Sequence, residues 1–419
     1  MTAASGQRCA LTGCRESVGS MIGRMRCRSL SLLFGITIVI GISHPIASGQ
    51  SAHEEITPIL LAVQDAPVPF RGSDGRMHLV YELWVTNFSS GEVSLEKVNV
   101  LGDDAVIQSL DRAAIAQRLQ PAGQRDSVEV LPKSTQALLF LHLTLAPGGA
   151  VPHEVSHQIT ARVLAAPPGH QEITESGGMA RVDRREVVRI GPPLQGEGYI
   201  SADSCCDATR HTRAALPVNG KVYIAQRYAV DWERVDAAHR IYSGPQQNVE
   251  SYAIANRPAI AVADAEVESV TDRYPQQTPG KFPTDIGIEE ADGNSVVLNL
   301  GGGRYALYAH LKPGSIRVRA HEKVKRGQVL GEVGNSGNSV APHLHFHVMD
   351  GPSPLVANGV PYEIDDYEVT GRTAGTTAFD KAEAEGTPLA ITPLMPAQRV
   401  RDGLPLDQLI VTFGATIDK

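Results

Sequence analysis

Three histidines alternate with apolar residues in the segment 342–348. A period of two is typical of a β-strand with one buried face, so His343, His345 and His347 are expected on one side of a strand. Imidazole is the commonest side-chain metal ligand and a general acid or base near neutral pH. Because a row of imidazoles is costly in an apolar core, the sequence predicts that it lines a cleft. A solvent-facing surface strand is the alternative.

Other residues suited to chemistry stand at the ends of predicted strands upstream of this stripe. Asp231 ends one strand, and His310 ends another in the sequence Tyr-Ala-Leu-Tyr-Ala-His-Leu. A glycine-rich turn containing Asn335 and Ser336 then leads directly to the histidines. We expect these two residues to shape the turn through side-chain to backbone hydrogen bonds, with substrate contact at the site as a secondary role.

The order and spacing of Tyr-Ala-His-Leu, Gly-Asn-Ser-Gly and Pro-His-Leu-His-Phe resembles the lysostaphin/LytM-type zinc metallopeptidases, which are peptidoglycan endopeptidases. The resemblance covers roughly residues 217–362. It implies a β-sheet core of the barrel-sandwich-hybrid type and a Zn²⁺ ion with three protein ligands and water. Asp231 and His345 match two zinc ligands, whereas His310 and His343 match the catalytic pair that does not bind the metal.

In such a site the metal acidifies the water and polarises the scissile carbonyl, and His310 or His343 takes the proton and stabilises the oxyanion. The match fails at the first zinc-ligand position, four residues before Asp231, where this chain has Arg227. Arginine stays protonated and has no lone pair for a metal. Arg227 could also line the site and pair with Asp231.

Three hypotheses therefore stay open. In the first, a replacement ligand restores a zinc peptidase; His211 is the best candidate, since the upstream segment of such enzymes can cross the metal cleft, and Cys205, Cys206 and His347 are others. In the second, a degenerate domain binds the cell wall or activates a partner without cutting. In the third, the likeness extends only to the β-core of biotinyl- and lipoyl-type barrels, although no lysine sits in the required hairpin.

The cysteines give no disulfide framework for the fold. Of the five in the chain, only Cys205 and Cys206 follow residue 49, and they are adjacent. The pair is expected to be a local disulfide, two free thiols or a metal contact.

The elements around these motifs predict an all-β protein. Short alternating segments separated by glycine, proline and asparagine turns predict an immunoglobulin-like sandwich that could bind a protein partner. Beyond it, a short helix is expected at 378–385 and a strand at 409–413. The predicted divisions are a signal peptide at 1–49, the sandwich at 52–165, a linker at 166–197, the LytM-like domain at 198–365 and a C-terminal extension at 366–419.

The first residues are typical of an export signal. Three arginines precede an apolar run at 30–42, and small residues follow it; Met21 or Met25 could be the true start. No later segment is long and apolar enough to span a membrane. The formal net charge of −8, without a basic run, argues against nucleic-acid binding. We therefore expect an exported protein, periplasmic or secreted, that acts on peptidoglycan peptides.

Overall fold

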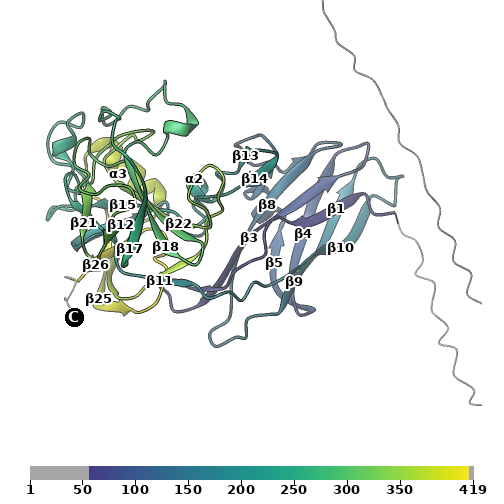
Figure 1. Ribbon diagram of the computed structural model, residues 1–419. Coiled ribbons are helices and arrows are strands. Elements are labelled where there is room, and N and C mark those ends of the chain that lie inside the picture. The colour runs from purple at the N-terminus through teal and green to yellow at the C-terminus, as the bar shows by residue number, and fades with distance from the viewer. Residues whose placement is uncertain (1–55, 415–419) are drawn as a thin grey trace, which may run out of the picture. The chain divides into compact units, whose positions relative to one another are not determined.

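The computed structural model describes residues 56–414, which belong to one compact unit (Figure 1). Strands make up most of its regular structure, so the predicted all-β class is confirmed. The predicted signal peptide lies outside the described residues. Among the helices that are described, none is long and apolar enough to cross a membrane.

The first part of the described chain is a β-sandwich. Its elements are β1 (Ile59–Val63), β2 (Phe70–Arg71), β3 (Met77–Asn87), β4 (Val93–Gly102), β5 (Ala105–Asp111), α1 (Arg112–Ala116), β6 (Leu119–Pro121), β7 (Val130–Leu131), β8 (Gln136–Thr144), β9 (Glu154–Val163) and β10 (Glu172–Arg181). One sheet has the order β1-β3-β8-β6 and the other β10-β9-β4-β5. Leu79 and Tyr81 of β3 join Val98 of β4 in a shared apolar core. The immunoglobulin-like connection of these strands stays a prediction.

The structure corrects the linker that was predicted at 166–197. β10 lies inside this segment and pairs antiparallel with β9 through most of its length. A register shift between Gly177 and Ala180 interrupts the alternation, and exposed polar residues fill one side of this edge strand. Polar residues and bulges are common on sheet edges, where they discourage further pairing. The glycines and polar residues therefore suggested a linker where the chain forms a strand.

A sheet of ten strands organises the rest of the chain, in the order β20-β17-β18-β19-β22-β15-β12-β26-β24-β25. These strands are β12 (Gly196–Ala202), β15 (Val230–Arg234), β17 (Ala265–Thr271), β18 (Ser295–Gly301), β19 (Arg304–Ala309), β20 (Lys323–Val324), β22 (Leu344–Met349), β24 (Tyr367–Thr373), β25 (Ile391–Val400) and β26 (Leu409–Phe413). The smaller elements are β11 (Val188–Ile190), α2 (Thr209–Thr212), β13 (Leu216–Val218), β14 (Lys221–Tyr223), η1 (Val249–Ser251), β16 (Pro258–Ile260), η2 (Ile288–Glu290), β21 (Val329–Glu332), β23 (Tyr362–Ile364) and α3 (Thr376–Glu385).

The predicted C-terminal extension is an integral part of this sheet. Its strand β26 pairs with β12, and β24 and β25 follow outward. The helix and the strand predicted for this region are confirmed as α3 and β26. A boundary at residue 365 is therefore wrong, because the strands on both sides of it share one set of backbone hydrogen bonds.

Strand β22 carries the histidine stripe near the middle of the sheet, between β19 and β15. Leu344, Phe346 and Val348 point into the large apolar core, as the alternation predicts. His345 and His347 lie on the opposite face, where both are buried. The stripe thus belongs to the interior and not to a solvent-facing strand.

Inside the sandwich, His157 is held in its neutral form. Its Nδ1–H donates to the Gly178 carbonyl at 3.1 Å, and its Nε2 accepts from the Tyr81 hydroxyl at 2.8 Å. Burial lowers the pKa of His157 to about 4. Since an imidazole in an unfolded chain has a pKa of about 6.5, the folded state resists protonation of this ring.

We predict that His157 makes the protein less stable in acid. The stability that comes from this neutral ring is complete above pH about 6.5 and is lost as the pH falls towards about 4, a change of about 3 kcal/mol. Urea denaturation from pH 7 to pH 4 measures it. His157→Gln should flatten this dependence, whereas His170→Gln, a change of an exposed residue, should keep it. Equal pH dependence in the two variants would contradict the assignment.

Candidate metal centre

Asp231 and His345 meet because their strands are neighbours. β15 pairs antiparallel with β22 so that Asp231 stands directly opposite His345, and side chains in that position share one face of the sheet. His345 Nδ1 lies 2.8 Å from Asp231 Oδ1. Both side chains are largely buried, with 4% and 17% exposed.

His211 reaches the same carboxylate from a different element. β12 pairs with the other edge of β15, with Ala202 opposite Asp231, so the chain that leaves β12 passes close to this carboxylate. In α2, His211 donates Nδ1–H to the Asp203 carbonyl at 2.8 Å. Its Nε2 lies 3.3 Å from Asp231 Oδ2. One ligand atom each from His211, Asp231 and His345 therefore fits within 4.8 Å.

His310 and His343 complete a ring of imidazoles around this carboxylate. His310 Nδ1–H donates to the Ser336 carbonyl, and His343 Nδ1–H donates to the Ala341 carbonyl, each at 2.8 Å. The two rings are 4.6 Å apart between centroids. His343 Nε2 lies 3.4 Å from Asp231 Oδ1. Because the backbone bond fixes the proton on Nδ1, each ring presents its Nε2 lone pair when neutral.

The buried carboxylate sets the charge of its neighbours. Burial by itself would raise the pKa of Asp231, but His211 and His343 hold it well below its usual value. Burial opposes protonation of His211, and the Asp231 charge nevertheless raises the pKa of His211 to about 9. His310 differs: burial, with the charges of His343 and His345, holds its pKa well below the usual value. The cluster therefore contains the carboxylate anion of Asp231, the imidazole of His211 in its cationic form beside it, and the neutral imidazole of His310.

The donor atoms fit a zinc ion. With Nδ1–H committed to a backbone carbonyl, only Nε2 of His211 faces the carboxylate oxygen 3.3 Å away, and the raised pKa of the ring means that a proton lies there at neutral pH. Two lone pairs that face each other need a proton or a metal ion between them. Two imidazoles and one carboxylate match the ligand set of hydrolytic zinc sites, which keep a further position open.

The structure corrects the placement of Arg227. Its Nε and Nη2 donate to Glu82 Oε1 and Oε2 at 2.8 and 2.7 Å, and Nη2 also donates to Asp65 Oδ2 at 2.9 Å. It does not pair with Asp231, nor does it line the cavity beside that residue. Arg227 lies in a turn between β14 and β15, so its direction does not follow the alternation that places Asp231.

The other three residues expected to line the site are Asn335, Ser336 and His347. They hold the surrounding structure in place instead. The Ser336 hydroxyl donates to the Leu311 carbonyl at 2.8 Å, and the Asn335 side chain donates to Gln277 and accepts from Ser339. Both thus shape the turn. They are fully buried and do not line the cavity. His347 Nδ1 lies 3.0 Å from His345 Nε2 and helps to orient that ring. The expectation that these residues line the site is therefore corrected.

A cavity of about 330 Å³ opens beside the cluster and reveals acidic residues that the motifs did not indicate. Glu233 follows Asp231 by two residues on β15, so the strand period could have identified it. Glu383 comes from α3, in a region that the resemblance does not cover. Burial raises the pKa of both carboxyl groups, and the negative charge of Glu383 raises that of Glu233 further. Asp292 also lines the cavity, and burial raises its pKa to about 6.

With this geometry established, comparisons with known proteins identify the class. Residues 246–358 match the model of peptidase family M23. This part of the chain is therefore similar to family M23, and the predicted resemblance to LytM-type peptidases is confirmed for it. The matched range includes His310, His343 and His345 but stops short of His211 and Asp231.

Curated relatives share only a part of this chain. The DD-carboxypeptidase/endopeptidase Mpg of Neisseria meningitidis is 32% identical over 116 residues, which cover 26% of each protein. The peptidoglycan DD-endopeptidase ShyA of Vibrio cholerae is 38% identical over 65 residues, which cover 16% of this chain and 15% of that protein. The chain thus spans about a quarter or less of the length of these relatives in the alignments.

Solved structures of the same family are also similar to this chain. The catalytic domain of the prophage-encoded M23 protein EnpA from Enterococcus faecalis is 20% identical and matches 40% of this chain and 92% of its own, with a TM-score of 0.24. The catalytic domain of lysostaphin from Staphylococcus simulans is 21% identical and matches 39% of this chain and 86% of its own, with a TM-score of 0.21.

We predict that Arg227 stabilises the fold and does not disturb the metal centre. Arg227→Met should lower the free energy of unfolding by about 3–5 kcal/mol, because it leaves Glu82 buried without its partner. Adding Glu82→Leu should recover much of this loss. Arg399→Met is the matched control, since Arg399 pairs with Asp366 at the surface and should cost less than about 1 kcal/mol. Urea denaturation of these three variants and of the unchanged protein measures the differences.

The same geometry predicts the result of restoring the family's usual residue. Arg227→His should not increase the zinc content of the purified protein, because that side chain points at Glu82 and not at Asp231. Metal analysis of the folded fraction checks this. A gain of zinc in Arg227→His would show that position 227 can turn into the centre.

Proposed function

We propose that this chain is an exported zinc metalloendopeptidase that hydrolyses peptide bonds of peptidoglycan. The observation that carries the proposal is the position of His211, whose Nε2 lies 3.3 Å from Asp231 Oδ2 while its Nδ1 is bonded to a backbone carbonyl. His211 thereby supplies the lone pair that Arg227 cannot. The proposed metal ligands are His211, Asp231 and His345.

A bound zinc ion would supply acidified water and a polarised scissile carbonyl. The residues of the chain supply the rest. His310 is held neutral with its Nε2 lone pair available, so it can accept a proton from the attacking water. His343 can carry a proton beside Asp231 and donate a hydrogen bond to the oxyanion that develops on the carbonyl. The backbone bonds at Nδ1 keep both rings oriented during these steps.

The substrate class rests on the cavity and on the relatives. The cavity beside the cluster has a volume of about 330 Å³ and is lined in part by Asp231, Glu233 and Glu383, so polar groups of a peptide could bind there. The names of both curated relatives describe endopeptidases, and one of these names specifies peptidoglycan. Export follows from the predicted signal peptide, and the sandwich remains a candidate surface for a protein partner.

The competing proposal is a domain that binds the cell wall without cutting it. The family's usual first ligand position holds Arg227, and the family match begins after Asp231. Such a protein would lack stoichiometric zinc and would be inactive on purified sacculi even with zinc added. The geometry of His211 favours the enzyme.

We predict that His211→Ala abolishes both zinc binding and activity. The unchanged protein, kept under oxidising conditions, should hold about one zinc ion per chain, and His211→Ala should reduce this content and the release of peptides from sacculi to background. His321→Ala is the control, since His321 is 81% exposed and lies outside the cluster. Metal analysis and a sacculus digestion assay give the two readouts. Full zinc content and activity in His211→Ala would refute His211 as a ligand.

A further inference from the structure

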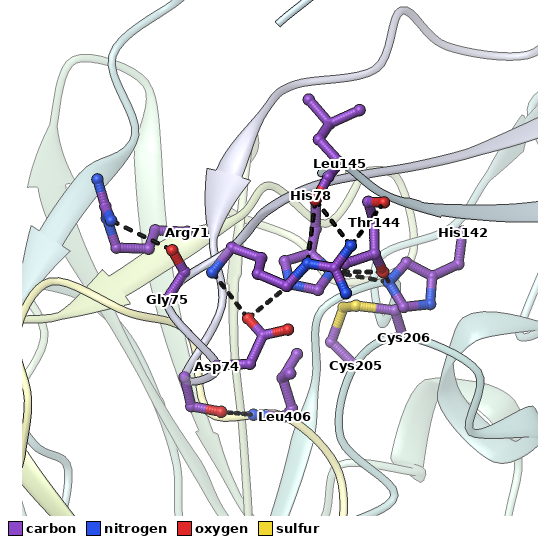
Figure 2. A network of polar contacts seen from close by, with 12 residues as sticks. Arg71, Asp74, Gly75, His78, His142, Thr144, Leu145, Cys205, Cys206 and Leu406 are labelled. Carbon is purple, nitrogen blue, oxygen red and sulfur yellow. Dashed lines mark hydrogen bonds and ion pairs between the residues drawn. A yellow bond between two sulfur atoms is a disulfide. The ribbon is translucent and has the colours of Figure 1, made fainter. Parts of the chain in front are cut away.

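A second pair of histidines meets outside the candidate centre, on the face of the sandwich that does not enter its core. His78 on β3 stands opposite Thr144 on β8, and His142 lies two residues from Thr144. The two rings are therefore diagonal neighbours on one face. His78 Nδ1 lies 2.9 Å from His142 Nε2, and the rings stack with centroids 5.2 Å apart (Figure 2).

The outer nitrogen of each ring is bonded to a carboxylate. His78 Nε2 lies 3.0 Å from Asp74 Oδ1, and His142 Nδ1 lies 2.9 Å from Asp207 Oδ2. Arg118 binds the other oxygen of Asp207 and fixes it. An ionised carboxylate only accepts hydrogen bonds, so each outer nitrogen carries the hydrogen. In the neutral rings both inner nitrogens then present lone pairs. The Thr144 hydroxyl lies 3.4 Å from each and can donate to only one of them, so the other has no donor unless a proton or a metal ion lies between the rings.

Cys206 provides a third donor atom at this point. Its Sγ and the ligand nitrogens of His78 and His142 all lie within 4.8 Å of one another. Cys205 and Cys206 form a disulfide in this structure, as Figure 2 shows beside the histidines. A thiolate is the sulfur species that binds metals well. The third ligand therefore depends on the oxidation state of the pair.

The residues around His78 and His142 are arranged as in known metal sites of proteins. His78 is almost fully buried, and Phe70 stacks on its ring with centroids 5.5 Å apart. Metal-binding histidines commonly donate their outer N–H to a carboxylate, which orients the ring and increases its basicity. A cavity of about 560 Å³, lined in part by His142, Cys205 and Cys206, gives an ion a way in.

We propose that His78 Nδ1, His142 Nε2 and the Cys206 thiolate bind a zinc-class divalent cation when the Cys205–Cys206 disulfide is reduced. Tetrahedral sites with Zn–N bonds of about 2.0–2.1 Å place two nitrogens about 3.4 Å apart, so the rings need to separate by only about half an ångström. Imidazole and thiolate ligands suit zinc and its substitutes. The site is distinct from the His211–Asp231–His345 cluster, which has no sulfur donor.

The redox step balances with a dithiol as the reductant. The Cys205–Cys206 S–S bond breaks and accepts two electrons and two protons from the dithiol, which becomes a disulfide itself. When the cation binds, the Cys206 thiol releases its proton to solvent. In the reverse direction a disulfide compound accepts two electrons, with one proton from the Cys205 thiol and one from solvent, the Cys205–Cys206 bond re-forms and the ion is released. The metal content of this site thus reports the redox state of the pair.

The test uses Co²⁺ as the probe, because a thiolate bound to Co²⁺ gives a near-ultraviolet charge-transfer band that nitrogen and oxygen ligands do not. The full chain carries Cys9→Ser, Cys14→Ser and Cys27→Ser, so that only the adjacent pair can contribute. After reduction by a dithiol and its removal without oxygen, we expect the band to appear with Co²⁺. The oxidised protein should lack it. The same spectrum in both states would overturn the proposal and leave a proton shared between His78 and His142.

Two neighbouring substitutions of the same kind give the matched comparison. Cys205→Ser prevents the disulfide and should show the band without any reductant, whereas Cys206→Ser should lose it in both states. A band that survives in Cys206→Ser would contradict the ligand assignment. Asp74→Asn should weaken Co²⁺ binding by about 10–100-fold, the effect of losing an outer-shell partner. Asp104→Asn, at an exposed position of the same sandwich, should leave it unchanged.

Discussion

The buried charge of Asp231 is the constraint around which the candidate metal centre is organised. A carboxylate removed from water is costly unless opposite charges or hydrogen-bond donors compensate for it. Here the compensation comes from three directions: β22 brings His345 opposite it, the segment before β22 brings His343, and the chain leaving β12 brings His211. Each imidazole sits where strand pairing or a short connection obliges it to be. His211 thus provides Asp231 with a cationic partner that Arg227, paired with Glu82, does not provide.

The sequence allowed most of this centre to be predicted, and its failures have a common cause. Strand alternation and short motifs indicated Asp231, His345, His343 and His310, because those signals are local. His211 could be proposed only as a candidate, since nothing local shows that the chain after β12 approaches Asp231. The placement of Arg227 was mistaken because its partner, Glu82, lies 145 residues away. Likewise, β10 was missed and the last three strands were set apart, because edge pairing and sheet membership depend on distant backbone.

The true partner of Arg227 explains a feature of the sandwich that its sequence conceals. On β3, His78, Val80 and Glu82 alternate with the side chains that enter the sandwich core. This alternation predicts that they are exposed to solvent, yet all three are buried. Leu138 and Phe140 of the same sheet form an apolar cluster with Ile224, which follows β14. A buried ion pair at this contact adds little net stability but strongly penalises any arrangement that separates its members. The pair of Arg227 and Glu82 therefore opposes separation of the sandwich from the segment that follows β14.

The same arrangement of hydrogen bonds orients the imidazoles in both histidine clusters. In each cluster an acceptor takes the outer N–H of an imidazole, so that the inner lone pair must face its neighbours: backbone carbonyls do this for His211, and the carboxylates of Asp74 and Asp207 do it for the pair at β3 and β8. The third donor differs. The Asp231 carboxylate has a pKa held well below its usual value and has no redox chemistry, so the donor it offers to the first cluster does not depend on the redox state. A thiolate exists only in the reduced state of its pair, so a site that includes Cys206 must follow the redox conditions of its compartment.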